Sequence, residues 1–298
     1  MPTASPAQDA RPTRNDLLYN PRLSVSGVAE TFARWGRESE RARAGLSGYL
    51  DVPYGPGPAE RLDIFRAHPH AGRSRAHAGR SLGAVLFIHG GYWRAFGKGD
   101  FSFVAPALAC AGVTVAVADY ALCPAVSVPD IVMQMVQATA WLHRNAGNFG
   151  APPNRLCLVG HSAGGQLAAM LLACLWPVYA ADLPVDLAKR AVALSGLYDL
   201  APLLDAPSLN AGIGVDTATA RKASPLWLPP GRDARLVSVV GERELQGFHD
   251  QDKLIRGRWK GHVAAPVAAP CADHFTVLDT LLDPASGVFR AILEALDS

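Results

Sequence analysis

The chain has 298 residues, of which 49% are hydrophobic and 18% are charged, a composition that supports a large buried core and excludes disorder of the whole chain. The 28 basic and 26 acidic side chains leave a formal charge of +2, which gives no indication of a nucleic-acid partner or an anionic membrane surface. Five scattered cysteines without a Cys-x-x-Cys pair indicate neither a disulfide framework nor a zinc site.

The first 22 residues contain four prolines and predict a flexible N-terminal tail without a regular element, ahead of a single domain over residues 23–298. No apolar stretch follows a basic start in this tail, and no apolar run in the chain approaches the roughly 20 residues that span a bilayer. We therefore expect no secretory signal, no membrane partner and a cytoplasmic location.

The next segments predict a surface helix over residues 28–46 and two short strands, 48–52 and 61–65, around a turn rich in proline and glycine. Residues 67–82 repeat the fragment Ala-Gly-Arg-Ser and carry histidines at 68, 70 and 77. These histidines could suggest a metal or anion site, but a segment so rich in Gly, Ala and Ser resists fixed ligand geometry. We expect a basic surface insert.

Apolar runs that favour strands alternate with helix-like segments through the rest of the chain. Because the runs are continuously hydrophobic, they predict parallel strands covered on both faces. The pattern predicts an α/β fold with a mostly parallel, doubly wound sheet flanked by helices, and such a sheet binds ligands at the carboxyl ends of its strands. The predicted strands are 84–88, 113–118, 156–159, 191–194, 236–240 and 262–268, and the predicted helices are 103–111, 130–145, 163–175, 246–256 and 286–296.

A candidate nucleophile follows the strand at 156–159, in the segment Gly160-His161-Ser162-Ala163-Gly164. This Gly-x-Ser-x-Gly pattern, between a strand and a helix, is typical of a strained turn that raises a serine hydroxyl above a sheet. The N–H groups of the following helix can then stabilise developing negative charge. The alternative is a glycine-rich turn that only packs a helix onto the sheet.

A candidate oxyanion hole follows the strand at 84–88, in the segment His89-Gly90-Gly91-Tyr92-Trp93. Two consecutive glycines let backbone N–H groups approach a substrate oxygen without a Cβ in the way. We assign Gly90 and Gly91 as donors, with the N–H of Ala163 as the third. A plain tight turn is the alternative. Tyr92 and Trp93 are candidate pocket residues, although both could equally pack in the core.

The candidate base is His274, in a loop after the last predicted strand, because the fold orders its catalytic residues as Ser, acid, His along the chain. Of the other late histidines, His249 falls in a helix-like segment and His262 begins a strand at the wrong end of the sheet. A polar loop histidine without a catalytic role is the alternative for His274.

The candidate acid follows the strand at 236–240, where Glu242 and Glu244 are both available. We prefer Glu244, since a turn is needed before a carboxylate can face back over the sheet edge toward the histidine. A carboxylate in this position orients the imidazole and stabilises its protonated form. Asp199 is the second choice, and a surface loop charge is the alternative for Glu244.

Taken together, these motifs resemble the serine-type kynurenine formamidases, or arylformamidases, within the hormone-sensitive-lipase-like esterases. The resemblance extends from about Tyr19 to the end and omits the insert at 67–82. The His-Gly-Gly-x-Trp form is more specific than the His-Gly-Gly-Gly of related esterases. The motifs that carry the resemblance are His89-Gly90-Gly91-Tyr92-Trp93, Gly160-His161-Ser162-Ala163-Gly164, Ser195-Gly196-Leu197-Tyr198-Asp199-Leu200, His274-Phe275-Thr276-Val277, and Tyr54-Gly55 with Arg61-Leu62-Asp63-Ile64-Phe65.

The resemblance implies an α/β-hydrolase fold that uses no cofactor and no metal, and the hydrolysis of N-formyl-L-kynurenine to L-kynurenine and formate in tryptophan catabolism. It implies a triad of Ser162, Glu244 and His274, with Gly90, Gly91 and Ala163 as oxyanion donors. Two other functions stay open, namely a carboxylesterase for short-chain acyl esters and a non-catalytic binding protein on the same fold. The partner is then a small molecule, and the sequence leaves open whether the chain forms a homodimer.

Overall fold

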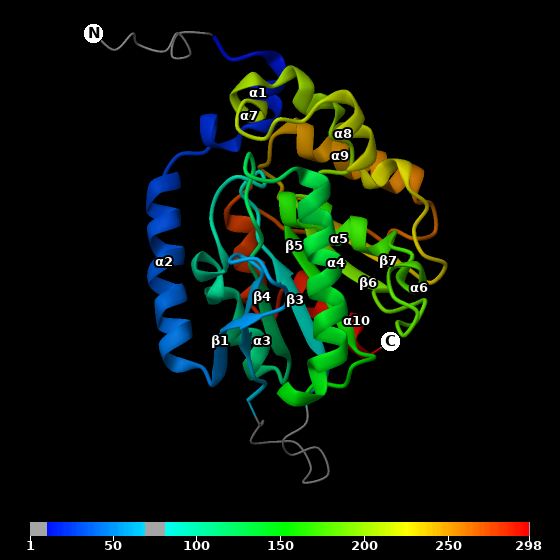
Figure 1. Cartoon of the computed structure of the whole chain (residues 1–298). Coiled ribbons are helices and arrows are strands. Elements are labelled where there is room, and N and C mark those ends of the chain that lie inside the picture. The colour runs from blue at the N-terminus through cyan, green and yellow to red at the C-terminus, as the bar shows by residue number, and fades with distance from the viewer. Residues whose placement is uncertain (1–10, 69–80, 298) are drawn as a thin grey trace, which may run out of the picture.

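The computed structural model describes residues 11–68 and 81–297, and a seven-stranded sheet forms its centre (Figure 1). The strand order is β1-β2-β4-β3-β5-β6-β7. Strands β3 to β7 run parallel to one another, whereas β2 is antiparallel to both β1 and β4. This arrangement confirms the predicted α/β fold. The strands are β1 (Gly48–Pro53), β2 (Arg61–Phe65), β3 (Ala84–Ile88), β4 (Thr114–Ala118), β5 (Leu156–His161), β6 (Arg190–Leu194) and β7 (Arg235–Val239).

Helices cover both faces of the sheet, and four short or medium helices, α1, α7, α8 and α9, gather at the end shown uppermost in Figure 1. Helices α4 and α5 pack together over one face, while α10 contacts β5 and β6. The helices are α1 (Arg14–Tyr19), α2 (Val28–Gly45), α3 (Ala105–Cys110), α4 (Val128–Asn145), α5 (Ala163–Leu172), α6 (Trp176–Tyr179), α7 (Pro207–Asn210), α8 (Thr217–Lys222), α9 (Gln246–Arg258) and α10 (Gly287–Asp297).

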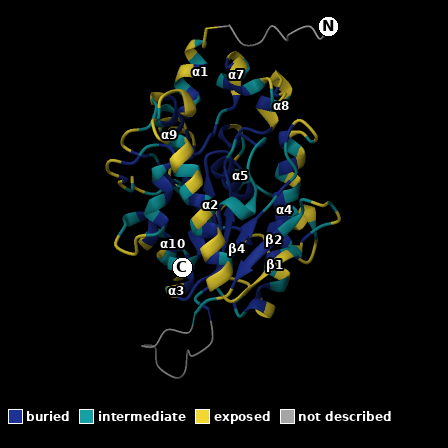
Figure 2. Cartoon of the chain, turned by 90° about the vertical axis from the view of Figure 1, so that its left-hand side faces the viewer, coloured by how far each residue is buried: buried dark blue, intermediate teal, exposed yellow. Residues whose placement is uncertain are grey.

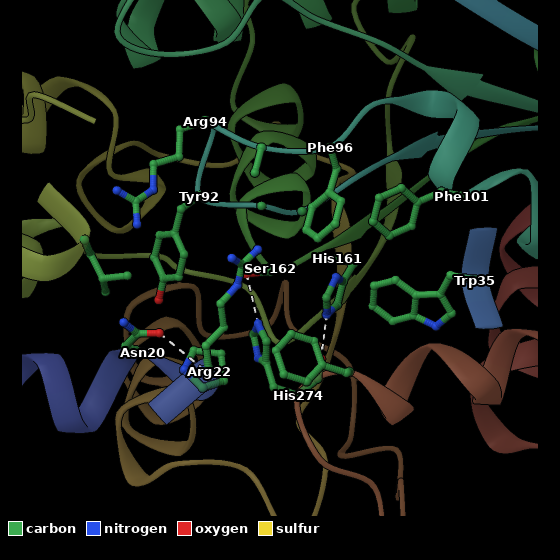
Figure 3. A pocket seen from close by; sticks show the side chains of 16 residues that line it. Asn20, Arg22, Trp35, Tyr92, Arg94, Phe96, Phe101, His161, Ser162 and His274 are labelled. Atoms are coloured by element: carbon green, nitrogen blue, oxygen red, sulfur yellow. Dashed lines mark hydrogen bonds between the residues drawn. The ribbon is translucent and has the colours of Figure 1, made fainter. Parts of the chain in front are cut away.

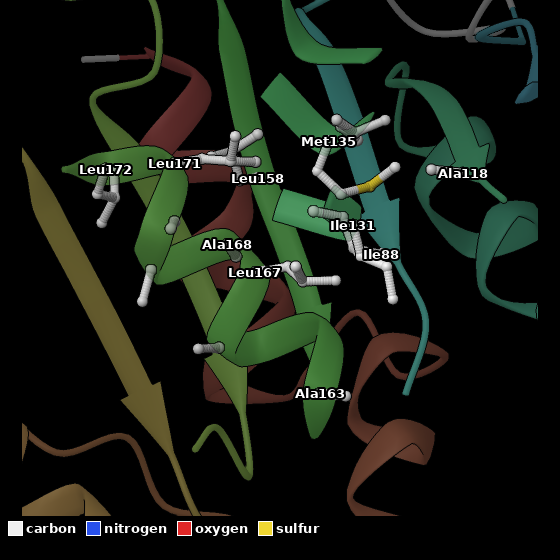
Figure 4. Packing of buried hydrophobic residues seen from close by; sticks show 14 of the residues in the cluster. Ile88, Ala118, Ile131, Met135, Leu158, Ala163, Leu167, Ala168, Leu171 and Leu172 are labelled. Atoms are coloured by element: carbon white, nitrogen blue, oxygen red, sulfur yellow. The ribbon is translucent and has the colours of Figure 1, made fainter. Parts of the chain in front are cut away.

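Each central strand sends alternate side chains into two separate hydrophobic cores, which explains why its sequence is apolar at every position. In β3, Leu86 and Ile88 pack into the core formed with α4 and α5, shown in Figure 4. Val85 and Phe87 point the other way, into the core formed with α3 and α10. Figure 2 shows the consequence, since the central strands are buried between the layers while the outer side of α2 is exposed.

The predicted strand at 262–268 is wrong. This segment makes one isolated parallel bridge, between Val263 and Leu236, and no strand follows it among the described residues. Pro266 lacks the N–H that a continued ladder requires, and the alanines around it contribute little side-chain packing. The sheet therefore ends at β7. The helix predicted over residues 163–175 also ends early, at Leu172.

The prediction that the N-terminal tail contains no regular element is wrong as well, because α1 lies inside it. Thr13 and Asp16 form a capping box that starts this helix, with the Asp16 carboxylate accepting from the Thr13 N–H at 2.9 Å. Asp16 also accepts from the backbone and side chain of Ser208, at 3.0 and 2.6 Å. The helix is thereby attached to α7. The insert predicted over 67–82 falls mostly on residues 69–80, which lie outside the described residues.

Candidate active site

Ser162 lies on the sharp turn between β5 and α5, with φ of 55° and ψ of −117°. Glycines on both sides make this turn sterically feasible. A Cβ on Gly160 would lie 2.0 Å from the Gly164 carbonyl oxygen, and one on Gly164 would lie 1.9 Å from the carbonyl oxygen of Ile88. The N–H of Ser162 donates to the Leu194 carbonyl at 2.8 Å, so the strained turn is tied to strand β6.

Three predicted residues meet in one hydrogen-bonded chain. The Ser162 Oγ lies 3.1 Å from Nε2 of His274, and Nδ1 of that imidazole lies 2.8 Å from Oε2 of Glu244. The carboxylate is fully buried, and its other oxygen accepts from the Ser195 hydroxyl at 2.5 Å and from the Gly241 N–H at 2.7 Å. Because a carboxylate only accepts, Nδ1 carries the proton, which leaves Nε2 free to accept the serine proton.

The two alternative acids are engaged elsewhere. Glu242 accepts a hydrogen bond from the backbone N–H of Cys271 at 2.8 Å, and Asp199 accepts from the N–H of Ala201 at 3.1 Å. The first bond joins two loops that lie 29 residues apart in the sequence and the second is local, and neither carboxylate is bonded to His274. The geometry therefore favours Glu244 over both alternatives.

The predicted oxyanion donors surround the serine. A Cβ built on Gly90 would lie 3.0 Å from the Ser162 Cβ, so the backbone passes directly beside Ser162. Gly91 has φ of 111°, a conformation that side chains rarely permit. Within the described part of the chain, the backbone N–H groups of Gly90, Gly91 and Ala163 donate no hydrogen bond. These three donors are thus available for an oxygen on the substrate.

His161 has a supporting role that the sequence analysis missed. Its Nε2 donates to the carbonyl oxygen of His274 at 2.7 Å, a contact that attaches the histidine loop to the nucleophile turn. Burial, with the neighbouring His274 as the next cause, lowers the pKa of His161 to about 3. The imidazole is therefore neutral, with its proton on Nε2, and its buried Nδ1 has no partner among the described residues. In the sequence, the only signal for this role was the position of His161 between Gly160 and Ser162 in the Gly-x-Ser-x-Gly pattern.

A pocket of about 210 Å³ opens over Ser162 and His274 (Figure 3). Tyr92 lines this pocket, as predicted. Trp93 does not, and its assignment as a pocket residue is corrected. Its side chain is fully buried in the core, and its N–H donates to the Gln166 side chain at 3.1 Å. Adjacent aromatic residues in one motif thus have different roles, because the chain turns between them.

No group of three or more His, Cys, Asp or Glu side chains in residues 11–68 and 81–297 is arranged to hold a metal ion. Over the same ranges, none of the helices combines the length and the apolar character that crossing a bilayer requires.

Comparison with known proteins gives one family match, to the α/β-hydrolase fold, over residues 85–248. The chain is 27% identical to a kynurenine formamidase of Salmo salar, over 89% of this chain and 88% of that protein. A kynurenine formamidase of Drosophila melanogaster is 26% identical, over 69% of this chain and 70% of its own length.

A solved structure from Silicibacter sp. TM1040, described as a candidate thioesterase, superimposes with a TM-score of 0.79 and is 30% identical, over 96% of this chain and 100% of that chain.

Proposed function

The chain belongs to the α/β-hydrolase family, and on that premise we propose that this serine hydrolase is an arylformamidase. Its substrate is N-formyl-L-kynurenine, and its products are L-kynurenine and formate. The observation that carries the proposal is the chain of hydrogen bonds from Ser162 through His274 to Glu244, beside three free backbone N–H groups. The kynurenine formamidases that match most of the chain support the choice of substrate.

In the first half of the reaction, the Ser162 oxygen attacks the formyl carbon while His274 Nε2 takes the hydroxyl proton. The former carbonyl oxygen becomes an oxyanion, which accepts from the N–H groups of Gly90, Gly91 and Ala163. Glu244 stabilises the imidazolium that forms. The C–N bond then breaks, and the arylamine leaves with the proton that His274 returns to it.

In the second half, a water molecule attacks the formyl ester on Ser162, and His274 takes the proton of that water. The oxyanion forms again at the same donors. When the bond to the serine oxygen breaks, His274 protonates that oxygen and formate departs. Each half thus uses the imidazole once as a base and once as an acid, which restores the enzyme.

The shape of the pocket supports a small acyl group and an aromatic leaving group. Gly90 passes beside Ser162 closely enough that even a methyl group on it would contact the serine, which leaves little room on that side of the hydroxyl. One wall of the pocket is aromatic, with Trp35, Phe96, Phe101 and Phe275 among its residues. A formyl group is the smallest acyl group, and an aryl ring packs well on aromatic side chains.

The test compares kcat/KM for N-formyl-L-kynurenine and for p-nitrophenyl acetate on one preparation, with active sites counted by fluorophosphonate titration. The proposal predicts a clear preference for the formamide. A clear preference for the ester would contradict it and favour the short-chain carboxylesterase. If the probe labels nothing and neither substrate reacts, the non-catalytic binding protein is favoured.

We also propose a cytoplasmic location. The five cysteines all have free thiols in the structure, which is the usual state of cysteines in a reducing compartment.

A further inference from the structure

Two arginines, Arg22 and Arg94, line the pocket together with its aromatic residues. In Figure 3, Arg94 lies beside Tyr92, and the Arg22 side chain extends toward the space in front of Ser162. The mechanism described above uses neither guanidinium. Their presence beside a reaction that transfers a neutral formyl group therefore needs a separate explanation.

Arg22 is brought to the pocket by the N-terminal segment, on the 3-10 turn that follows α1. The Tyr92 hydroxyl donates to the carbonyl oxygen of Tyr19, and the Asn20 side chain accepts from the Arg22 N–H at 3.3 Å. The guanidinium lies over the Phe96 ring, 5.7 Å from its centroid. These contacts direct a long and otherwise exposed side chain over the active site.

Arg94 is held from the opposite side. Its backbone N–H donates to the Gly91 carbonyl at 3.1 Å, which closes the turn after the oxyanion glycines. One guanidinium nitrogen donates to the Ser208 carbonyl at 3.2 Å, and the other N–H groups remain available. Burial, and after it the positive charge of Arg22, lower the pKa of Arg94. Two like charges thus face the same space.

Among the described residues, 11–68 and 81–297, no acidic side chain is paired with Arg22 or Arg94, and no Asp or Glu lines the pocket. The acidic group of the triad, Glu244, is bonded to His274. Holding two cations together without a counter-ion is unfavourable, and an anion between them would relieve the repulsion.

We propose that Arg22 and Arg94 form a carboxylate-binding subsite, so that the preferred substrate is an aryl formamide that bears a carboxylate on its side chain. The proposal rests on the proposed function and adds to it the group that selects the substrate. The ring lies against the aromatic wall, the formamide reaches Ser162, and the carboxylate accepts hydrogen bonds from the two guanidinium groups. Because no acidic side chain lines the pocket, the subsite recognises the carboxylate and does not require an α-ammonium group.

The first test compares kcat/KM for N-formyl-L-kynurenine with kcat/KM for formanilide, a neutral aryl formamide. In Arg22→Gln and Arg94→Gln, this ratio is expected to fall by about 10- to 100-fold, the usual cost of one lost charge-assisted hydrogen bond. General damage to the fold would lower kcat/KM for both substrates together, so it would leave the ratio unchanged. Arg144→Gln, on a remote surface ion pair with Asp182, is the matched control and keeps the wild-type ratio. An unchanged ratio in both pocket variants overturns the proposal.

The second test does not depend on formamide turnover. It measures inhibition of p-nitrophenyl acetate hydrolysis by 4-oxo-4-phenylbutanoate and by butyrophenone, an aryl ketone of similar size without the carboxylate. The wild type is expected to bind the carboxylate compound at least about tenfold more tightly, and the two pocket variants to lose this difference. Equal inhibition of the wild type by both compounds overturns the subsite. If the difference is present but N-formyl-L-kynurenine is not hydrolysed, the proposed function fails while the subsite stands.

Discussion

Replacing Glu244 by glutamine changes one atom in a side chain whose two oxygens have different partners. Oε1 accepts from two donors, the Ser195 hydroxyl and the Gly241 N–H, whereas Oε2 accepts only from His274 Nδ1. In the variant, the amide oxygen must therefore take the place of Oε1, where it still accepts from the two donors, and the NH₂ group takes the place of Oε2. The NH₂ group then faces Nδ1, which must become an acceptor, because two donors cannot bond to each other.

This change moves the imidazole proton of His274 to Nε2, where it points at the Ser162 oxygen and blocks the removal of the serine proton. The corresponding carboxylate-to-amide change in a serine protease triad lowers kcat by about 10⁴-fold through the same tautomer. We expect a similar loss here, which equals about 5 kcal/mol of transition-state stabilisation. The melting temperature should change little, since the amide oxygen still accepts from the Ser195 hydroxyl and the Gly241 N–H. Glu244→Ala, by contrast, leaves both donors without an acceptor, which lowers the free energy of unfolding by about 1–3 kcal/mol for each.

The assay is kcat for N-formyl-L-kynurenine, with the melting temperature measured on the same samples. Glu242→Gln is the matched control, because Glu242 lies two residues away and bonds only to the Cys271 N–H. It is expected to retain activity within about threefold, as a substitution away from the reacting groups. The reasoning is refuted if Glu244→Gln keeps more than about a tenth of the activity with an unchanged melting temperature, or if both variants lose activity equally.

Three further predictions concern the same site. Ser162→Ala and His274→Ala should each abolish turnover while circular dichroism stays native, and near-native activity in either variant would remove that residue from the mechanism. His161 stays neutral in the folded chain down to pH about 3 but protonates near 6.5 when unfolded. Its contribution to stability is therefore complete above pH 6.5 and is lost toward pH 3, by about 1.4 kcal/mol per pH unit. The free energy of unfolding of His161→Gln, measured in urea, should fall less steeply than that of the wild type between these pH values. An identical pH dependence of the two proteins would contradict a neutral, buried His161. Gly164→Ala, whose Cβ would lie 1.9 Å from the Ile88 carbonyl oxygen, should displace the nucleophile turn and lower the melting temperature, and a stable, active variant would show that the turn tolerates a side chain.

The sheet and the nucleophile turn were predictable because local chemistry determines them. Strands buried on both faces must be apolar at every position, and the turn at Ser162 requires glycine at 160 and 164, a spacing that the sequence shows directly. The same reasoning explains the error at 262–268. An apolar run favours a strand, but Pro266 removes the donor on which the ladder depends.

The parts that were missed depend on contacts between distant segments. The capping box at Thr13 and Asp16 could have indicated α1, yet its attachment to Ser208 has no signal in the sequence. Trp93 and Tyr92 are neighbours with the same apolar character, and only the turn between them decides which one lines the pocket. Glu244, in contrast, was preferred over Glu242 from the sequence, and the direction of the loop that decides between them is given by the structure.

Labelling with a fluorophosphonate probe tests most directly whether Ser162 is the group that attacks the formamide. The experiment maps the modified peptide by mass spectrometry and repeats the labelling in the presence of N-formyl-L-kynurenine. We predict that the probe attaches to Ser162 alone and that the formamide slows the attachment as it occupies the same pocket. Modification of a different residue, or undiminished formamide hydrolysis by the fully labelled protein, would contradict the account.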